Sequence, residues 1–302
     1  MPPYSRLPKR VLVTGAGGFI GSAVAAALLD RGHQVIAAVG RRSAGRLTQT
    51  AVGRQGLTVL RGDLADDGFA LPREIEVVVH AAATSPAPGV TVADMVRDNE
   101  VATARLLHHV AAIGAESVIY LSSLSAYGHV ATTELDENTE IRNPDAYGLT
   151  KRHGEQMLAA LAPRLRALAI RLPGMLGAGS VRNWLTGVLA AAQAGRDIPV
   201  YNCLAPFNNA AHIEDLAAFI NETIVDVSWR GYAAFPIGAA GSISVGDAVM
   251  ILINGTGAGS RMLDQGVRSP CYTISNRAAL ARGYRPRHIT DMLHAFVREN
   301  RP

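Results

Sequence analysis

The chain has 302 residues, of which 29 are basic and 25 acidic, so its net charge is +4, and 48% of its residues are hydrophobic. This composition excludes a mainly disordered chain, and the length is enough for one large domain or one large and one small domain. No run approaches the roughly 18 apolar residues of a membrane span, no signal-peptide pattern precedes the first apolar run, and the basic residues are scattered, so we expect a cytoplasmic protein that binds neither membrane nor nucleic acid.

Short apolar runs alternate with longer amphipathic ones over the first two thirds of the chain, which is the pattern of β-α-β units. The expected strands cover residues 10–13, 34–39, 57–61, 77–80, 117–122 and 167–171. The expected helices between them cover residues 18–31, 92–113 and 146–161. The strands are uniform runs of Val, Ile and Leu, as in sheets that helices cover on both faces. The predicted fold is therefore α/β, a doubly wound parallel sheet of the Rossmann type.

The pattern loosens into glycine-rich loops after Arg171. A helix is expected at residues 181–194, short strands around Val200 and Phe207, and helices near 212–225 and 289–298. We interpret this part as a smaller, interleaved substrate lobe. The predicted division is a dinucleotide-binding domain at 1–172, to which some later segments return, and a mainly substrate-binding lobe at 173–302.

A glycine-rich segment joins the first strand to the first helix, with glycines at G-x-x-G-x-x-G spacing: Gly15, Gly18 and Gly21. Free N–H groups at a helix N-terminus bind a pyrophosphate, and glycines let the backbone approach it closely. We therefore expect a dinucleotide against this turn, including Phe19 and Ile20. The alternative is a glycine-rich turn without a ligand.

The end of the second strand bears on the choice of cofactor. Val39 stands where NAD sites usually carry an acidic residue, and Arg41 and Arg42 follow. Guanidinium groups suit a 2'-phosphate, so we expect NADP, with NAD possible. Alternatively, both arginines are solvated loop charges. Asp63 and Leu64, after the third strand, are expected at the adenine edge, or Asp63 simply caps a helix.

Serines follow the fifth strand at its carboxyl end, where doubly wound sheets place their chemistry. Ser123 is the candidate for a hydrogen bond to a substrate oxygen, with Ser125 as the second choice. Alternatively, such serines satisfy backbone groups.

Tyr147 and Lys151 lie four residues apart, so on a helix both project from one face. An ammonium near a phenol lowers the phenol's pKa from about 10 and makes it a usable acid or base, and it can also bind ribose hydroxyls. The alternative is a surface tyrosine and lysine on a helix.

Taken together, these motifs resemble the extended short-chain dehydrogenase/reductases, and more narrowly the NAD-dependent epimerase/dehydratase family acting on nucleotide sugars. The segments that carry the resemblance are Thr14-Gly15-x-x-Gly18-x-x-Gly21, Asp63-Leu64, His80-Ala81-Ala82, Asn99, Ser123 before Tyr127-Gly128, and Tyr147-x-x-x-Lys151. It continues through Arg171–Gly177, Asn183-Trp184 and His212–Asp215.

The resemblance implies Tyr147 as the acid/base, Lys151 as ribose anchor and Ser123 as the group that polarises the substrate oxygen. It implies cofactor contacts from the glycine turn and Ala81, and a substrate-diphosphate contact from Asn183. It also implies a homodimer built on the helices at 92–113 and 146–161.

The chain also departs from the family pattern. Gly174 stands where asparagine is common and Asn208 where a phosphate-binding arginine is common. Arg261 or Arg268 could supply the missing cation, and Arg268 is the expected substrate contact.

These observations predict an NAD(P)-dependent epimerase or dehydratase of a nucleotide sugar. The alternatives are an NADPH-dependent reductase of a keto-sugar or other carbonyl compound, and a non-catalytic dinucleotide sensor. The nine histidines form no zinc motif, so no metal is expected, and Cys203 and Cys271 are expected to be buried thiols.

Overall fold

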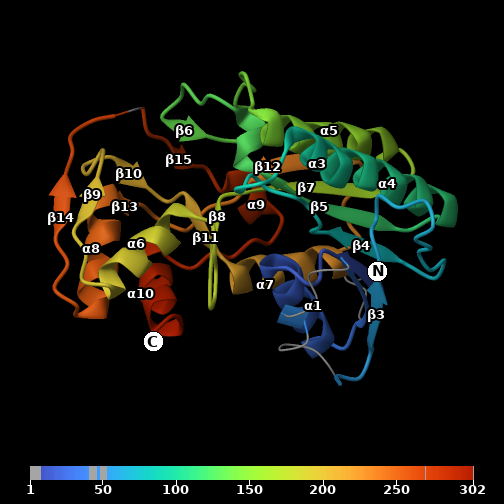
Figure 1. Ribbon diagram of the computed structural model, residues 1–302. Helices are drawn as coiled ribbons and strands as arrows, with labels where there is room; N and C mark the ends of the chain where they lie inside the picture. Colours follow the sequence, from blue (N-terminus) through green and yellow to red (C-terminus); the bar gives the residue numbers. More distant parts are fainter. Residues whose placement is uncertain (1–7, 41–45, 48–52, 269, 302) are drawn as a thin grey trace. The chain divides into compact units, whose positions relative to one another are not determined.

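The computed structural model describes residues 8–40, 46–47, 53–268 and 270–301 (Figure 1). The chain divides into two compact units. Unit 1 comprises Met1–His129, Ile141–Arg171 and Ala217–Phe235, and unit 2 comprises Val130–Glu140, Leu172–Leu216 and Pro236–Pro302.

Unit 1 is built on a seven-stranded sheet that contains all six expected strands. Along the sheet the order is β12 (Tyr232–Pro236), β7 (Arg166–Leu172), β5 (Ser117–Ser123), β4 (Val77–His80), β1 (Arg10–Thr14), β2 (Gln34–Val39) and β3 (Leu57–Arg61). The strand β12 was not anticipated. The predicted doubly wound α/β fold is confirmed.

The strand order reverses at β1, which pairs in parallel with β2 on one side and with β4 on the other. The register places Thr14, the last residue of β1, opposite His80, the last residue of β4. Ligands of open α/β sheets bind at such a switch point, outside the carboxyl ends of the strands. The expected cofactor turn leaves β1 at this place.

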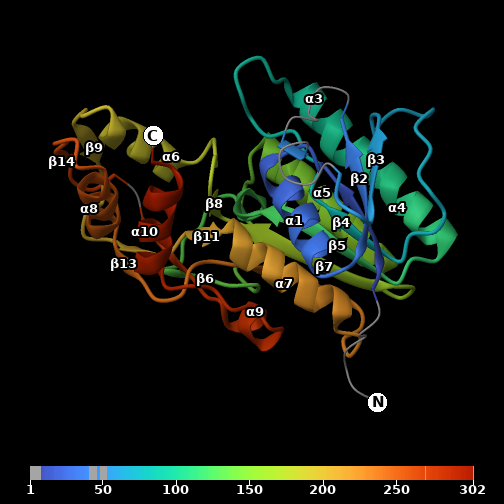
Figure 2. The same cartoon turned by 90° about the horizontal axis from the view of Figure 1, so that it is seen from below.

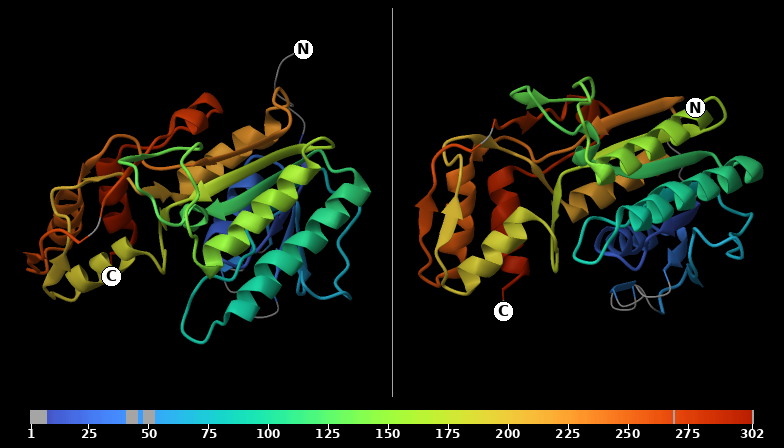
Figure 3. Two further views of the ribbon diagram at one scale, coloured as in Figure 1. Left: turned by 90° about the horizontal axis from the view of Figure 1, so that it is seen from above. Right: turned by 45° about the horizontal axis from the view of Figure 1, so that its top comes forward.

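Helices cover both faces of this sheet (Figures 1 and 2). On one face lie α1 (Phe19–Asp30) and α7 (Ile213–Val225). On the other lie α3 (Val92–Val96), the π-helical turn η1 (Arg97–Val101) and α4 (Ala102–Ile113), which follow one another end to end, and α5 (Ala146–Leu161), which runs beside them in Figure 3. Strands β4 and β7 are buried along their whole length, which explains why most of their residues are apolar; the exceptions are His80 in β4 and Arg166 and Arg171 in β7.

The segment expected as one helix at 92–113 is helical throughout, but it contains an unanticipated π-helical turn. It begins with a reciprocal capping box between Thr91 and Asp94 and ends at Gly114, which adopts φ 69°. Between these caps, η1 carries the buried Asn99. Such single π turns occur frequently at functional sites.

In its described residues, unit 2 combines two-stranded sheets with helices. The strands are β6 (Glu134–Leu135), β8 (Gly174–Leu176), β9 (Ile198–Val200), β10 (Pro206–Phe207), β11 (Ala210–His212), β13 (Ile243–Ser244), β14 (Met262–Asp264) and β15 (Thr273–Ile274). The helices are α6 (Trp184–Gln193), α8 (Val245–Thr256), α9 (Arg277–Ala281) and α10 (Ile289–Glu299). Leucine and phenylalanine side chains of α6, α8 and α10 form its apolar core. Cys203 is buried there as expected, whereas Cys271 is only partly buried.

Among the described residues, no helix is both long and apolar enough to cross a membrane.

Candidate active site

The turn after β1 has the geometry of an anion cradle. Gly15 has φ +65°, and a Cβ atom there would lie 2.7 Å from the backbone of Ala82. A Cβ on Gly21 would lie 2.3 Å from the carbonyl oxygen of Gly15. Gly18 is the N-cap of α1 and provides no side-chain cap, so the first-turn N–H groups of the helix, which starts at Phe19 and Ile20, suit a phosphate.

Of the residues expected near the ribose and adenine, the structure describes Asp63 but neither arginine. Arg41 and Arg42 lie outside the described residues. Asp63 forms an ion pair with Arg97 and accepts a hydrogen bond from the backbone N–H of Ala65 at 2.9 Å. Asp63 therefore has a local structural role, close to the alternative that the sequence left open.

Two further cofactor candidates lie beside these elements. The backbone carbonyl of Leu64 accepts a hydrogen bond from Arg105 at 3.1 Å. Ala81 follows β4 directly and is half-buried, next to Ala82, which is in contact with the turn at Gly15.

The two candidate serines and Tyr147 come together at the end of β5. Ser123 is the last residue of the strand, and its Oγ lies 3.2 Å from Ser125 Oγ and accepts a hydrogen bond from Ser125 N at 3.1 Å. The Ser123 side chain also hydrogen-bonds Tyr147. Burial raises the pKa of Tyr147, and the hydrogen bond from Ser123 partly opposes that rise. At neutral pH this phenol is protonated.

A glycine permits the close approach between α5 and the loop that carries these serines. Asp145 caps the helix by accepting a hydrogen bond from Gly148 N at 2.7 Å. A Cβ on Gly148 would lie 2.1 Å from the carbonyl oxygen of Ser125. Gly148 stands between Tyr147 and Lys151, but its spacing in the sequence predicted no role for it.

Lys151 lies one turn further along α5 and is almost completely buried. Its Nζ sits 4.2 Å from the centre of the Tyr120 ring, a cation–π contact. Burial lowers the pKa of Lys151 to about 7, and the charge of Glu155 acts in the opposite direction. The expectation that this lysine lowers the pKa of Tyr147 differs from what we find, because the net shift of the tyrosine pKa is upward and burial is its main cause.

Glu155, which the sequence analysis missed, is a fully buried carboxylate on the same face of α5. It accepts hydrogen bonds from Ser122 Oγ at 2.6 Å, Arg152 at 2.9 Å, and the Nε and Nη2 of Arg171 at 2.9 and 2.8 Å. Burial acts to raise the pKa of Glu155, but the hydrogen bonds, that of Arg171 above all, hold it below its usual value. A carboxylate four residues after Lys151, together with an arginine inside an apolar strand, was the available signal.

In unit 2, two asparagines are engaged in local structure. Asn183 caps α6 by accepting a hydrogen bond from Thr186 N at 2.9 Å, and its Nδ2 donates to Met175 O at 3.0 Å. Asn208 exchanges two hydrogen bonds with the backbone of Ile274, at 2.7 and 2.9 Å. Asn208, which stands where related sequences commonly have an arginine, thus joins its own backbone segment to that of Ile274.

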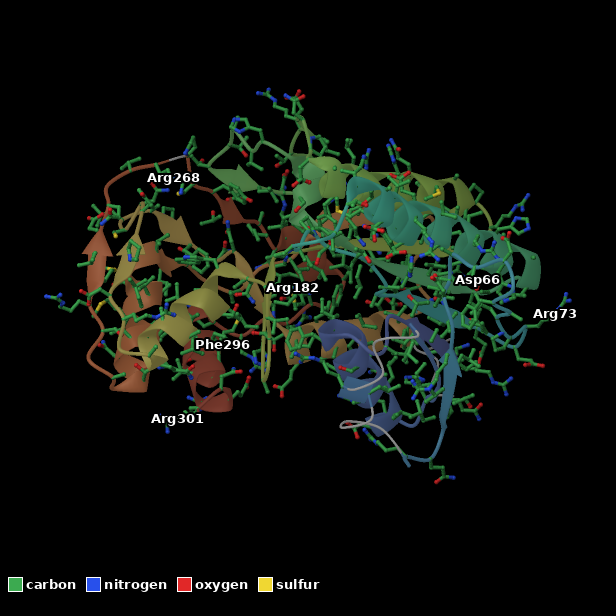
Figure 4. All side chains as sticks on the ribbon, in the orientation of Figure 1. Asp66, Arg73, Arg182, Arg268, Phe296 and Arg301 are labelled. Atoms are coloured by element: carbon green, nitrogen blue, oxygen red, sulfur yellow. The ribbon has the colours of Figure 1, made fainter. Side chains whose placement is uncertain are left out.

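The two candidate cations of unit 2 differ in their partners. Arg261 forms a two-pronged ion pair with Asp197. Arg268, labelled in Figure 4, places its guanidinium 5.2 Å from the centre of the Tyr201 ring. No group of three His, Cys, Asp or Glu residues within the described part of the chain could hold a metal ion.

Comparison with known proteins finds a family match over most of the chain. The model of the "NAD dependent epimerase/dehydratase family" matches residues 11–226. A dTDP-6-deoxy-L-talose 4-dehydrogenase (NAD(P)(+)) of Kitasatospora kifunensis is 31% identical over 195 residues, 61% of this chain and 58% of that protein. A UDP-glucose 4-epimerase of Azospirillum brasilense is 29% identical over 177 residues, 56% of this chain and 50% of that protein. The chain thus spans about half the length of these curated relatives.

Solved structures match over nearly the full chain. An epimerase from Methanothermobacter thermautotrophicus superposes with a TM-score of 0.83 at 20% identity, covering 97% of this chain and 92% of that one. MoeE5 in complex with UDP-glucuronic acid and NAD superposes with a TM-score of 0.77 at 25% identity, covering 96% and 98%. The first likeness is evidence of the shared fold.

Proposed function

Because the chain belongs to the NAD-dependent epimerase/dehydratase family, we propose that it is an epimerase or dehydratase that transfers hydride to and from a nucleotide sugar. The observation that carries the proposal is the hydrogen-bonded pair of Ser123 and Tyr147, with the buried Lys151 one helical turn away. A buried lysine is costly to a fold, and its retention beside this pair argues for chemistry rather than for packing.

The cofactor we propose is NAD or NADP, held by the turn Gly15–Gly21. The steric fit of that turn and the uncapped start of α1 suit a pyrophosphate. Bound there, a nicotinamide would supply the acceptor and donor of hydride. The family description and the complex of MoeE5 name NAD and give no support to a preference for NADP.

The chain's own groups would manage the proton that accompanies the hydride. As hydride leaves the sugar carbon, the hydroxyl proton would pass to the phenolate of Tyr147, and as hydride comes back Tyr147 would return that proton to the carbonyl oxygen. Burial raises the pKa of Tyr147, so the phenol form needed for the second transfer is the favoured one. Ser123, which already hydrogen-bonds Tyr147, steadies the same oxygen. Lys151 presents a compact cation for ribose hydroxyls.

For the substrate we propose a nucleotide sugar, as in the relatives named above. In unit 2 we propose Arg268 rather than Arg261 as the cation for its diphosphate, because Arg261 is paired with Asp197. Asn183 and, near the reacting carbon, Ser125 remain proposed contacts.

A second candidate is an NADPH-dependent reductase of a keto-sugar or another carbonyl compound. The observation that favours it is Asn208, which the structure commits to the backbone of Ile274 where a phosphate-binding cation is common in the family. A substrate without a diphosphate would not need that cation.

We also propose a homodimer formed through the outer faces of α3, η1 and α5. Val92, Val96, Val101 and Leu149 of these helices are 56%, 37%, 45% and 43% exposed, although valine and leucine are usually inside. Light scattering on the wild type and on Val96→Glu tests this. We expect a dimer that the variant splits, and a wild-type monomer contradicts the proposal.

The function is tested by denaturing freshly purified protein and identifying any released nucleotide by mass and absorbance. Tightly held NAD(H) or NADP(H), near one per chain, supports the epimerase or dehydratase, since a hydride returned in the same cycle leaves the cofactor in place. In a second experiment, native protein is incubated with UDP-glucose, and an isomer or a dehydrated product is looked for. An empty protein that binds NADPH and reduces carbonyl compounds supports the reductase.

Arg41 and Arg42 give a prediction on cofactor choice. If they bind a 2'-phosphate, replacing both by alanine raises the Kd for NADPH at least about tenfold and leaves that for NADH within about twofold, because only one cofactor carries the extra charge. Fluorescence titration with both cofactors measures this, with Arg61→Ala, an exposed arginine at the end of β3, as the control. Equal effects on the two cofactors contradict the role and leave NAD as the cofactor.

A further inference from the structure

Three buried side chains, Thr14, His80 and Thr103, form a continuous hydrogen-bonded row that ends on the backbone carbonyl of the buried Asn99 in unit 1. Thr14 Oγ1 lies 2.6 Å from His80 Nδ1, and His80 Nε2 lies 2.8 Å from Thr103 Oγ1. Thr103 Oγ1 in turn donates to the carbonyl oxygen of Asn99 at 2.5 Å. All four residues are at most 1% exposed, so water does not satisfy these groups.

The hydrogen atoms available to this row fix the state of His80. Thr103 donates its single hydroxyl hydrogen to Asn99 O, so its Oγ1 must accept a hydrogen bond from His80 Nε2. Burial, together with the charge of Lys151, lowers the pKa of His80 to about 3, so the ring is neutral and carries only that one proton. Its Nδ1 is therefore an acceptor, and Thr14 donates to it while accepting from Ala82 N at 3.2 Å.

The row joins the two ends of the proposed site. At one end, Thr14 directly precedes Gly15 and also holds Ala82, the residue in contact with the turn. At the other end, the Asn99 side chain accepts from Thr84 N at 2.7 Å and donates to Thr150 Oγ1 at 3.0 Å.

The connection then reaches the catalytic helix. Thr150 Oγ1 donates to the carbonyl oxygen of Tyr147 at 2.8 Å, and Thr150 immediately precedes Lys151. Asn99 Nδ2 uses its second hydrogen on the carbonyl oxygen of Thr84 at 2.9 Å, so each hydrogen atom along the path has one acceptor and the path has one arrangement of protons.

We propose that His80 is a positioning residue: its neutral imidazole, protonated on Nε2, ties the cofactor turn through Thr14 to the Asn99–Thr150 anchor of the catalytic helix. The inference rests on the proposed function, because it assigns a purpose within a cofactor site. An apolar side chain would fill the same space without four buried polar groups to satisfy, so packing alone does not account for the row. The row also uses the carbonyl and the side chain of a residue inside the π-helical turn.

The test is a double-mutant cycle on NAD binding, which needs no sugar substrate. Thr14→Val and Thr103→Val each remove one hydroxyl with almost no change of shape and leave one side of His80 unpaired. We expect each to raise the Kd for NAD about tenfold. Since both act through the same imidazole, the double variant also shows about a tenfold loss, not a hundredfold one.

Thr223→Val is the matched control, because Thr223 is also buried in unit 1 and donates to a carbonyl four residues back, that of Phe219 at 2.8 Å. It lowers the Tm and leaves the Kd within about twofold. If the row has a merely structural role, Thr14→Val and Thr103→Val also lower the Tm and leave the Kd for NAD within about twofold, and this result overturns the proposal. A hundredfold rise of the Kd in the double variant also overturns it, because the two substitutions then act independently. A wild-type protein that binds neither NAD nor NADP contradicts the proposed function itself.

Discussion

Replacing Tyr147 by phenylalanine lowers kcat at least about a hundredfold and changes the Kd for NAD less than about threefold. The hydroxyl is the group that exchanges a proton with the substrate oxygen, and a lost general acid/base usually costs this much. The ring itself stays in place, since the first turn of α5 is fixed by Asp145 and by the contact of Gly148 with Ser125. Steady-state kinetics and fluorescence titration give the two numbers.

The control for this variant is Tyr284→Phe in unit 2. Tyr284 is buried and its hydroxyl donates to Gly238 O at 3.2 Å, so the variant also loses a buried hydrogen bond. We expect a lower Tm and an unchanged kcat. If the two variants lose similar amounts of activity, Tyr147 is not the acid/base.

The second large effect concerns the only two lysines of the chain, Lys9 and Lys151. Lys151→Met abolishes turnover and weakens NAD binding, yet raises the free energy of unfolding of the cofactor-free protein at pH 7. The reason is that the folded state lowers the pKa of Lys151 to about 7, so keeping it charged opposes folding. Methionine fills similar volume without that cost.

The sign of the pH dependence follows from the same shift. Between about pH 7 and the ordinary lysine pKa near 10.5, the unfolded chain binds this proton and the folded chain does not, so the wild-type protein gains stability as the pH rises. Lys151→Met lacks this gain, and the stabilities of the two proteins converge toward pH 10. Thermal unfolding of both proteins between pH 6 and 10 measures the difference.

Lys9→Met is the opposing control. Burial acts to lower the pKa of Lys9, but its hydrogen bonds and ion pairs with Glu116 and Glu76, both at 2.9 Å, raise it overall. Its charge therefore favours folding at neutral pH, and its removal destabilises the protein. If Lys151→Met destabilises the protein in the same way, its ammonium has a structural purpose.

The sequence predicted the framework of unit 1 because its elements follow from local pattern. The helix 146–161 was predicted with its observed bounds, since Asp145 is a good N-cap and the helix packs one amphipathic face on the sheet. By contrast, the helix Val245–Thr256 was missed, because its two glycines and its valine and isoleucine residues read as loop or strand. Its capping box, Ser244 with Asp247, was the local signal that opposed this interpretation.

The candidate site was predictable only as far as sequence spacing reaches. Tyr147 and Lys151 share a helix face by their separation. Two of the partners of Glu155, by contrast, lie on β5 and β7, and those of His80 lie on β1 and α4. No local pattern in the sequence indicates that these strands and helices are neighbours. For the same reason the sequence could not reveal that Gly148 is required by Ser125.

The glycines of the turn after β1 limit what a glycine motif can tell about whether a chain still binds a cofactor. Gly15 and Gly21 are demanded by the protein's own backbone, at Ala82 and at Gly15 respectively, before any nucleotide arrives. A descendant that had abandoned its cofactor would still need both glycines in order to fold. A more discriminating marker of retained chemistry is a residue that destabilises the folded state, and in this chain that residue is Lys151.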